Sequence, residues 1–304
     1  MSDRLTLGQL LRWGTEVLRR AGLEEPQLEA AHLLASLLGT DRGGLYGSLV
    51  EGAAPAVIRG FQRAIKLRRR RWPAAYITGW RQFLDFSVKT DARALIPRPE
   101  TELLVEAALE MLDRLNTAEP VVADIGTGSG VIAIALARRC PSGHLLATDI
   151  SADALDLARE NALRLGVGGQ IRFYRGDLIQ PLREAGWAGK IDLVVSNPPY
   201  IAEERWGELP PEVVLHEPPL ALAGGRDGLA FYRRLAQEVP AVLGPGGGLA
   251  LEIGSEQAVA VTELLDAAGF TEVEVRKDYA GHDRVVLAWL GTERNSFAGS
   301  SDSR

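Results

Sequence analysis

Residues 121–130 read Val-Val-Ala-Asp-Ile-Gly-Thr-Gly-Ser-Gly and run directly into Val-Ile-Ala-Ile-Ala-Leu-Ala-Arg-Arg at 131–139. The first five residues are apolar except for Asp124, as in a short strand that is buried on both faces. The glycines let the backbone turn sharply and let a ligand approach closely, because they have no Cβ atom. The next stretch predicts a helix over 131–139. A strand, a glycine-rich turn and a helix in this order are typical of an open α/β sheet.

The same alternation of strand and helix continues toward the end of the chain. Regular alternation implies a parallel sheet with helices on both faces, and the last two strands, with no helix between them, predict an antiparallel edge. The expected fold is therefore α/β, with a Rossmann-like, mostly parallel seven-stranded sheet and an antiparallel last strand. The expected strands are 121–125, 144–149, 171–174, 191–196, 249–253, 272–276 and 284–289, and the expected helices are 100–115, 131–139, 152–165, 228–243 and 256–268.

The N-terminal quarter of the chain has a different pattern. Apolar residues recur at helical spacing over 6–72, and glycines and prolines separate the groups, which predicts a small bundle of roughly four short helices. Three stretches of β-type residues then predict a hairpin, and they are Tyr76–Ile77, 83–88 and 94–96. The expected domains are a helical domain at 1–73, a β-hairpin linker at 74–96, an α/β domain at 97–291 and a disordered tail at 292–304.

A run of basic residues, Lys66 and Arg68–Arg71, ends the last helix of the predicted bundle. Cations are favourable near a helix C-terminus because of the helix dipole, so the run fits a solvated helix end. It also fits a contact with a phosphate-rich or acidic partner. The sequence leaves both interpretations open.

The bulk composition is that of an ordinary globular protein, with 46% hydrophobic and 24% charged residues. A net charge of −6 argues against broad binding to nucleic acid, which needs a basic surface, so no stable nucleic-acid binding is expected. Cys140 is the only cysteine, and the four histidines have no metal-ligand spacing, so we expect neither a disulfide nor a metal site. With no apolar signal segment or membrane span in the sequence, the expected location is the cytoplasm.

Candidate ligand-binding residues follow three of the predicted strands. The loop Gly126-Thr127-Gly128-Ser129-Gly130 suits either the pyrophosphate of a dinucleotide or the aminoacyl part of S-adenosylmethionine. Asp149 ends the next strand about twenty residues later, where a carboxylate accepts hydrogen bonds from ribose hydroxyls. After the third strand, Asp177 could accept from an adenine amino group and Leu178 could pack on its ring, although Asp177 fits a helix cap equally well.

The fourth predicted strand ends in Asn197-Pro198-Pro199-Tyr200. Two prolines fix φ and have no N–H group, so this tetrapeptide is stiff and cannot continue the sheet. The side-chain oxygen of Asn197 and the carbonyl oxygen of Pro198 remain as acceptors at the ligand-binding edge, with Tyr200 as a flat wall. This arrangement suits an NH2 group on a planar conjugated group.

The glycine loop together with Asn-Pro-Pro-Tyr resembles the Class I methyltransferases that modify exocyclic or amide nitrogens. Over roughly residues 10–290 the chain is similar to the HemK/PrmC family, the release factor glutamine N5-methyltransferases. The further segments that carry the resemblance include Tyr76-Ile77-Thr78-Gly79, Leu95 to Glu102, Glu217-Pro218, Asp227-Gly228-Leu229, Leu251-Glu252-Ile253-Gly254 and Asp283-Arg284-Val285.

The resemblance implies an S-adenosylmethionine-dependent enzyme that methylates the glutamine amide of the Gly-Gly-Gln motif in peptide chain release factors. It implies that the cofactor binds at Gly126 to Gly130, Asp149, Asp177, Leu178 and Asn197, and that Asn197, Pro198, Pro199 and Tyr200 hold the substrate. Within that set, Asn197, Pro198 and Tyr200 are the expected catalytic residues. The resemblance also makes the helical domain a substrate-recognition module and the α/β domain the methyltransferase domain.

We expect catalysis by positioning and by acceptor dipoles, with no essential general base. Two other activities fit the same tetrapeptide, namely adenine-N6 or guanine-N2 methylation of nucleic acid and glutamine methylation of a ribosomal protein. A non-catalytic dinucleotide-binding module is a third possibility from a different class. Binding of S-adenosylmethionine but not of NAD would separate the enzyme from that module.

Overall fold

The computed structural model describes residues 5–291, which divide into two compact units. Of the described residues, unit 1 takes in 5–81, 89–92 and 208–217, and unit 2 takes in the remainder. The tail expected at 292–304 lies outside the described residues. None of the helices within 5–291 combines the length and the apolar character that a membrane span requires.

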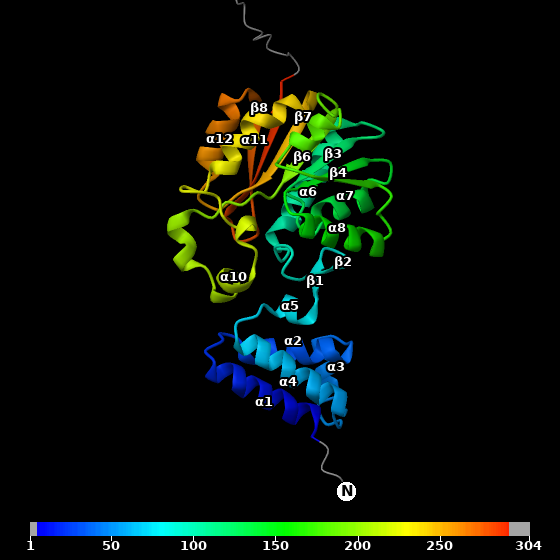
Figure 1. Ribbon diagram of the computed structural model, residues 1–304, viewed down its shortest axis with the longest axis vertical. Helices are drawn as coiled ribbons and strands as arrows, with labels where there is room; N and C mark the ends of the chain where they lie inside the picture. Colours follow the sequence, from blue (N-terminus) through cyan, green and yellow to red (C-terminus); the bar gives the residue numbers. More distant parts are fainter. Residues whose placement is uncertain (1–4, 292–304) are drawn as a thin grey trace, which may run out of the picture. The chain divides into compact units, whose positions relative to one another are not determined.

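In unit 1 the helices α1 to α5 pack around one apolar core (Figure 1). Thr6 and Gln9 form a capping box at the start of the first helix, because each side chain accepts from the backbone N–H of the other. Prolines occupy the first position of the second and fourth helices, where the missing N–H has no cost. Gly39, at φ +67°, ends the second helix. The helices are α1 (Leu7–Arg20), α2 (Pro26–Leu38), α3 (Arg42–Gly47), α4 (Pro55–Arg69) and α5 (Ala74–Thr78).

The hairpin is shorter than the sequence predicts. Its strands are β1 (Trp80–Phe83) and β2 (Phe86–Lys89). The strand expected at Tyr76–Ile77 is wrong, because these residues lie in α5, where the N–H groups of both donate to the carbonyl of Pro73. Pro73 sets the backbone angle at the start of this turn, and Gly79 ends it at φ +79°.

The strand expected at 94–96 is also wrong, because these residues pair with no strand. Their apolar character has another cause. Ala94 is buried against Ala154 and Leu157 of a helix in unit 2. A short apolar run cannot distinguish burial against a helix from pairing in a sheet.

The basic run at the end of α4 divides into two groups. Lys66, Arg69 and Arg70 are exposed, as a solvated helix end predicts. Arg68 is buried, which corrects that interpretation for this residue. Its Nε and Nη2 atoms donate to both carboxylate oxygens of Glu29, at 3.0 and 2.9 Å, and Nη2 also donates to Glu212 at 2.9 Å. Arg68 therefore joins three segments of unit 1.

Unit 2 contains a seven-stranded sheet in the order β5-β4-β3-β6-β7-β9-β8. All neighbours from β5 to β7 are parallel, and β9 is antiparallel to both β7 and β8. The mostly parallel sheet with an antiparallel last strand is therefore confirmed. The strands are β3 (Val121–Ile125), β4 (His144–Asp149), β5 (Ile171–Arg175), β6 (Ile191–Ser196), β7 (Leu243–Glu252), β8 (Phe270–Lys277) and β9 (Asp283–Leu290).

Helices cover both faces of this sheet and form two apolar cores (Figure 1). One core gathers α6, α7 and part of α8, and the other gathers α9, α11 and α12. The helices are α6 (Glu100–Leu115), α7 (Val131–Arg139), α8 (Ala152–Arg164), α9 (Gln180–Glu184), α11 (Ala230–Glu238) and α12 (Ala258–Ala267), while the short α10 (Pro211–His216) belongs to unit 1.

Strand β7 begins six residues before the position expected from the sequence. Glycine and proline at 244–248 argue against a strand. The sheet accommodates them with an irregularity, since Ile191 pairs with Leu243 while Leu193 pairs with Gly248. At Gly248 an added Cβ would lie 2.5 Å from the Cε of Met111, so this side chain would have to move. The helix expected at 228–243 is in turn shorter, and a 3-10 turn at Val239–Ala241 contains Pro240.

Candidate active site

Because of the register of the sheet, the strands β3, β4 and β6 end at the same edge. Ile125 pairs with Thr148 on one side and with Ser196 on the other. The segments that follow these residues therefore meet at one edge, as expected for parallel strands. The side chain of Ser196 strengthens this edge, because its hydroxyl donates to the carbonyl oxygen of Ile125 at 2.7 Å.

The glycine loop adopts a backbone that requires glycine. Gly126, Gly128 and Gly130 have φ values of +73°, +56° and +87°. A Cβ at Gly126 or Gly128 would meet no atom within 4 Å, so open space lies beside both. A Cβ at Gly130 would lie 3.0 Å from the Cβ of Ala158, so this glycine allows close packing between α7 and α8. Gly126 and Gly128 thus face the ligand space, whereas Gly130 has a packing role.

The loop is held from the buried side by the Thr127 side chain and the Ser129 backbone. The hydroxyl of Thr127 donates to Oδ2 of Asp124 at 2.6 Å, and the backbone N–H of Ala133 donates to the same oxygen. The carbonyl of Ser129 accepts from the amide of Asn161 at 3.0 Å. Asp124 is fully buried, and burial raises its pKa to about 7. This aspartate stabilises the glycine loop from its buried side. It was not among the functional residues predicted from the sequence.

Asp149 closes the cavity on the side of β4. Its Oδ2 accepts from the backbone N–H of Gly128 and its Oδ1 accepts from that of Ser151, both at 2.9 Å. Each carboxylate oxygen keeps a further lone pair, so a pair of ribose hydroxyls can still bind. Burial raises the pKa of Asp149.

Asp177 has a partner that the sequence did not predict. Nη1 and Nη2 of Arg234 on α11 donate to its two carboxylate oxygens at 3.0 and 2.9 Å. An adenine amino group would therefore share Asp177 with Arg234. The neighbouring Leu178 has φ +45°, and its carbonyl accepts from the hydroxyl of Thr148 at 3.0 Å. This bond fixes the turn that places Leu178 at the cavity.

The Asn197–Tyr200 segment is held at both ends. The amide nitrogen of Asn197 donates to the hydroxyl of Thr101 at 3.1 Å. The carbonyl of Tyr200 accepts from Nε2 of Gln257 at 3.1 Å, and Ile201 donates to the carbonyl of Leu222 at 2.9 Å. Burial, and then the nearby carboxyl of Glu252, raise the pKa of Tyr200 to about 12. Tyr200 is therefore a neutral, packed side chain at physiological pH.

One cavity of about 360 Å³ joins most of these residues, a volume in the usual range for a small-molecule site. Pro97, Ile132 and Phe231 add apolar wall. Gly130 and Tyr200 are the two expected site residues that do not line it. Those that do are Gly126, Thr127, Gly128, Ser129, Asp149, Asp177, Leu178, Asn197, Pro198 and Pro199.

The residues present fit S-adenosylmethionine. The open space beside Gly126 and Gly128 admits a ligand that a Cβ would obstruct. Asp149 supplies acceptors for a ribose, and apolar side chains such as Leu178 and Ile132 offer surface to a purine ring. Among the described lining residues, Asp149 and Asp177 are the only carboxylates, and both already accept hydrogen bonds.

Three residues of this site were not predicted from the sequence to be functional. Arg234 contacts Asp177, while Thr101 and Glu252 form a buried hydrogen bond of 2.7 Å behind Asn197. Thr101 and Glu252 stand in segments already noted for their resemblance to a family, which was the only signal available.

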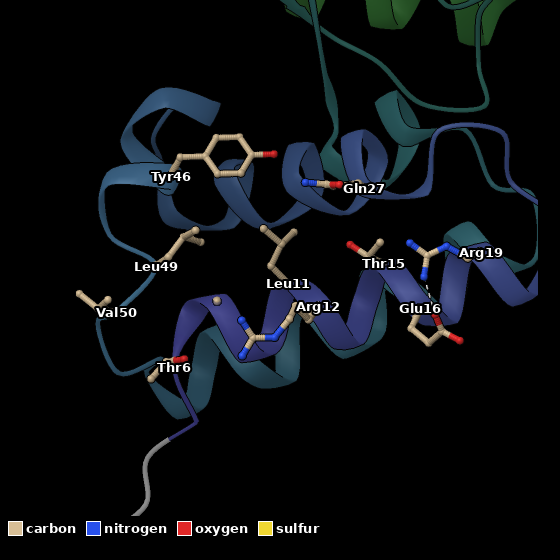
Figure 2. A pocket seen from close by; sticks show the side chains of 11 residues that line it. Thr6, Leu11, Arg12, Thr15, Glu16, Arg19, Gln27, Tyr46, Leu49 and Val50 are labelled. Carbon is tan, nitrogen blue, oxygen red and sulfur yellow. Dashed lines mark hydrogen bonds and ion pairs between the residues drawn. The ribbon is translucent and has the colours of Figure 1, made fainter.

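Unit 1 has a cavity of its own, of about 770 Å³ (Figure 2). Leu11 and Thr15 on α1 point toward α2 and α3, which contribute Gln27 and Tyr46, and Arg12 and Glu16 also line the cavity. Glu16 already pairs with Arg19 and Arg20, and the cavity is open. Its lining offers contact surface but no cluster of groups suited to catalysis.

Known proteins resemble the chain along nearly its whole length. The PrmC N-terminal domain model matches residues 9–79, and the Methyltransferase small domain model matches residues 101–209. A release factor glutamine methyltransferase of Moorella thermoacetica is 43% identical over 290 residues, which cover 95% of this chain and all of that protein. A release factor glutamine methyltransferase of Bacillus subtilis is 40% identical over 288 residues, which cover 94% of this chain and 98% of that protein.

A solved structure supports the fold independently. The hMettl16 catalytic domain, in complex with the MAT2A 3′UTR hairpin 1, matches with a TM-score of 0.55 at 17% identity, over 85% of this chain and 88% of that one. At this identity the likeness concerns the fold alone. Because relatives at 43% and 40% identity span almost the full length and both domain models match, the chain belongs to the release factor glutamine methyltransferase family.

Proposed function

We propose that this chain transfers the methyl group of S-adenosylmethionine to the side-chain amide nitrogen, N5, of the glutamine in the Gly-Gly-Gln motif of peptide chain release factors. The observation that carries the proposal is the position of Asn197-Pro198-Pro199 on the same cavity as the glycine loop and Asp149. The names of the full-length relatives indicate the substrate.

S-adenosylmethionine supplies an electrophilic methyl group on a sulfonium. In the proposed site the backbone of Gly126 and Gly128 leaves room for its aminoacyl part, Asp149 accepts from its ribose, and Leu178 packs on its adenine. Asp177 contributes an acceptor beside Arg234. These roles rest on the lining of the cavity and on the hydrogen bonds described above.

The protein's task is to orient a weak nucleophile. The lone pair of an amide nitrogen is delocalised, so correct alignment with the methyl carbon contributes more than added basicity. Asn197 Oδ1 and the Pro198 carbonyl would accept the two hydrogens of the glutamine NH2 and stabilise the positive charge that grows on nitrogen. The nitrogen lone pair forms the new N–C bond as the S–C bond breaks onto sulfur, and one proton of the nitrogen then leaves to water.

Two details of the proposal follow from the cavity. Its described lining holds no histidine and no free carboxylate, which supports a mechanism without an essential general base. Tyr200 does not line the cavity, so a stacking role for its ring requires the substrate amide to extend past Pro199. Its packed position otherwise makes it a support for the backbone of the tetrapeptide.

We further propose that unit 1 binds the release factor through an acidic surface of that factor. Residues 5–81 carry 12 basic and six acidic side chains, a net charge of +6 in a chain of net charge −6. Four exposed cations of α4 and its C-cap follow helical spacing and share one face, at Arg59, Arg63, Lys66 and Arg70. Among the described residues none of the four has an ion-pair partner, so the face is available to carboxylates.

Labelled methyl transfer tests the proposed reaction. Purified release factor should accept label from S-adenosylmethionine, and a release factor whose Gly-Gly-Gln glutamine is changed to alanine should not. Label on neither protein, with activity on DNA, rRNA or a ribosomal protein instead, would reject the substrate and favour one of the other activities that fit the tetrapeptide.

A charge reversal tests the role of unit 1. The double change Arg59→Glu and Arg63→Glu should raise KM for the release factor at least tenfold and leave the Kd for S-adenosylmethionine unchanged, because long-range attraction to the partner is lost. Arg42→Glu, at an exposed position on α3, is the matched control. An unchanged KM in the double variant, or an equal rise in the control, would reject the α4 surface.

A further inference from the structure

A chain of three polar side chains runs inward from the cavity wall. Nδ2 of Asn197 donates to Oγ1 of Thr101 at 3.1 Å, and this hydroxyl donates to Oε2 of Glu252 at 2.7 Å. Thr101 lies in the first turn of α6 and Glu252 at the end of β7, and their exposed fractions are only 3% and 1%. A buried carboxyl is costly, so its presence beside the expected substrate-binding asparagine calls for an explanation.

The chemistry of the three groups determines which one donates and which one accepts in each hydrogen bond. A hydroxyl has one proton to donate, and an ionised carboxylate can only accept. If Thr101 gives its proton to Glu252, it can only accept from Asn197. The NH2 group of Asn197 must then point inward, and its Oδ1 is left for the cavity that Asn197 lines. The proposed reaction needs this orientation, because an acceptor must face the substrate NH2.

We infer that Thr101 and Glu252 are positioning residues that hold the Asn197 carboxamide with its oxygen toward the methyl-accepting nitrogen. This inference rests on the proposed function for its role in catalysis. Thr101 also forms part of the cavity wall, but in this scheme neither residue contacts the substrate amide. They act through Asn197, and the ionised form of Glu252 is the active one.

The groups around Glu252 bring the pKa of its carboxyl into the physiological pH range. Burial raises its pKa to about 7, against the hydrogen bond from Thr101, the positive charge of Arg284 on β9 and a hydrogen bond from Asn197 itself. Glu100 on α6 raises the pKa further, and the hydroxyls of Tyr200 and Tyr232 also lie nearby. Arg284 in turn pairs with Asp278 at 3.2 Å. The neutral ring of Tyr232 donates its hydroxyl to the backbone carbonyl of Glu252 at 3.0 Å.

Protonation of Glu252 would reverse the donor and the acceptor in both hydrogen bonds. A protonated Glu252 can donate to Thr101, and Thr101 then donates to Asn197 instead of accepting from it. The Asn197 amide would turn its NH2 group toward the cavity and present donors to the substrate NH2 group, whose hydrogens are donors as well. We therefore expect kcat to fall as the pH drops through about 7.

Kinetics with conservative variants test the positioning role. Thr101→Val removes the hydroxyl at similar volume and should lower kcat about tenfold, with KM for the release factor changed less. Thr101→Ser restores the hydroxyl and should recover most of the loss. Glu252→Gln still offers an acceptor to Thr101 but cannot ionise, so its kcat should lose the pH dependence near 7. Equal kcat in Thr101→Val and Thr101→Ser, or a pH profile unchanged in Glu252→Gln, would overturn the inference.

A second measurement needs no substrate and so separates this inference from the proposed function. The chain has four asparagines, so selective 15N labelling gives few side-chain NH2 signals, and Asn197→Asp identifies the one of interest. That signal should shift with pH around 7 in the wild type, and should not do so in Glu252→Gln. A pH-independent signal in the wild type would refute the relay even in an active enzyme. A titrating signal in a protein that fails to methylate release factors would leave the relay intact and reject only the proposed substrate.

Discussion

Replacing Gly224 by alanine is expected to slow methyl transfer while leaving the protein folded. Gly224 lies beside the last residue of the Asn197–Tyr200 segment, and its N–H donates to the carbonyl of Ile201 at 2.9 Å. A Cβ at this position would lie 2.7 Å from both the Cα and the carbonyl carbon of Tyr200, and 2.9 Å from the Cα of Gly228. All three neighbours are backbone atoms, so no flexible side chain can move aside.

The size of the effect follows from the overlap. An ordinary contact begins near 3.4 Å, so the backbones must separate by about 0.7 Å. Gln257 holds the Tyr200 carbonyl from the other side, so part of the shift passes along the stiff tetrapeptide to Pro198 and Asn197. A misplacement approaching 1 Å at reacting groups costs up to about 100-fold in rate, so we expect kcat to fall by roughly 10- to 100-fold. Overpacking of this kind costs about 1–3 kcal/mol of stability, or a fall in Tm of roughly 3–10 °C.

The assay is single-turnover transfer of labelled methyl to the release factor, at a temperature well below the Tm of the variant. Calorimetric titration with S-adenosylmethionine runs beside it, and the Kd should change less than threefold because the glycine loop is not displaced. Gly207→Ala is the matched control, since its added Cβ would meet no atom within 4 Å. A Gly224→Ala protein that retains its fold and at least half the wild-type kcat would refute the reasoning.

Three further predictions concern binding and stability. Asp149→Asn should weaken binding of S-adenosylmethionine about 10- to 100-fold in calorimetric titration, since one carboxylate oxygen becomes a donor; an unchanged Kd would remove Asp149 from the site. Burial raises the folded-state pKa of Asp124 and Glu252 to about 7, whereas their unfolded-state values lie near 4. The stability that these two groups contribute is therefore complete below about pH 4 and is lost as the pH rises through 7. Urea unfolding should therefore give a free energy that declines from pH 5 to 8, and less steeply in Glu252→Gln; equal slopes would contradict the buried charge. Arg68→Met should cost about 1–3 kcal/mol in the same assay because it leaves the partly buried carboxylate of Glu29 without its partner, whereas Arg69→Met, at an exposed position, should cost little.

The sequence predicted the features of the fold that depend on local pattern. The apolar run at 121–125, the glycine turn and the strand–helix alternation are all present, because their signal lies within a few residues. The errors in the predicted strands arose where a local pattern is compatible with more than one environment in the fold. Ala94 was expected in a strand and is instead buried against α8, and β7 continues through glycines that a one-dimensional pattern takes as a break.

The candidate site divides in the same way. Gly126, Asp149 and Asn197 could be found because each follows a strand whose end the sequence marks. Thr101 could not, because it meets Asn197 across 96 residues and Glu252 across 151. No spacing rule links positions so far apart, and only the folded sheet shows that α6, β6 and β7 meet there.

The pairing of Arg68 with Glu212 makes the helical unit discontinuous along the chain. The two residues are 144 positions apart, with the glycine loop and most of the sheet encoded between them. At a synthesis rate of about 5–20 residues per second, Glu212 leaves the ribosome roughly 7–30 s after Arg68. Throughout that interval the nascent bundle has only Glu29 to neutralise its buried guanidinium. A chimera that exchanges the helical unit between relatives must therefore transfer residues 208–217 together with the N-terminal helices.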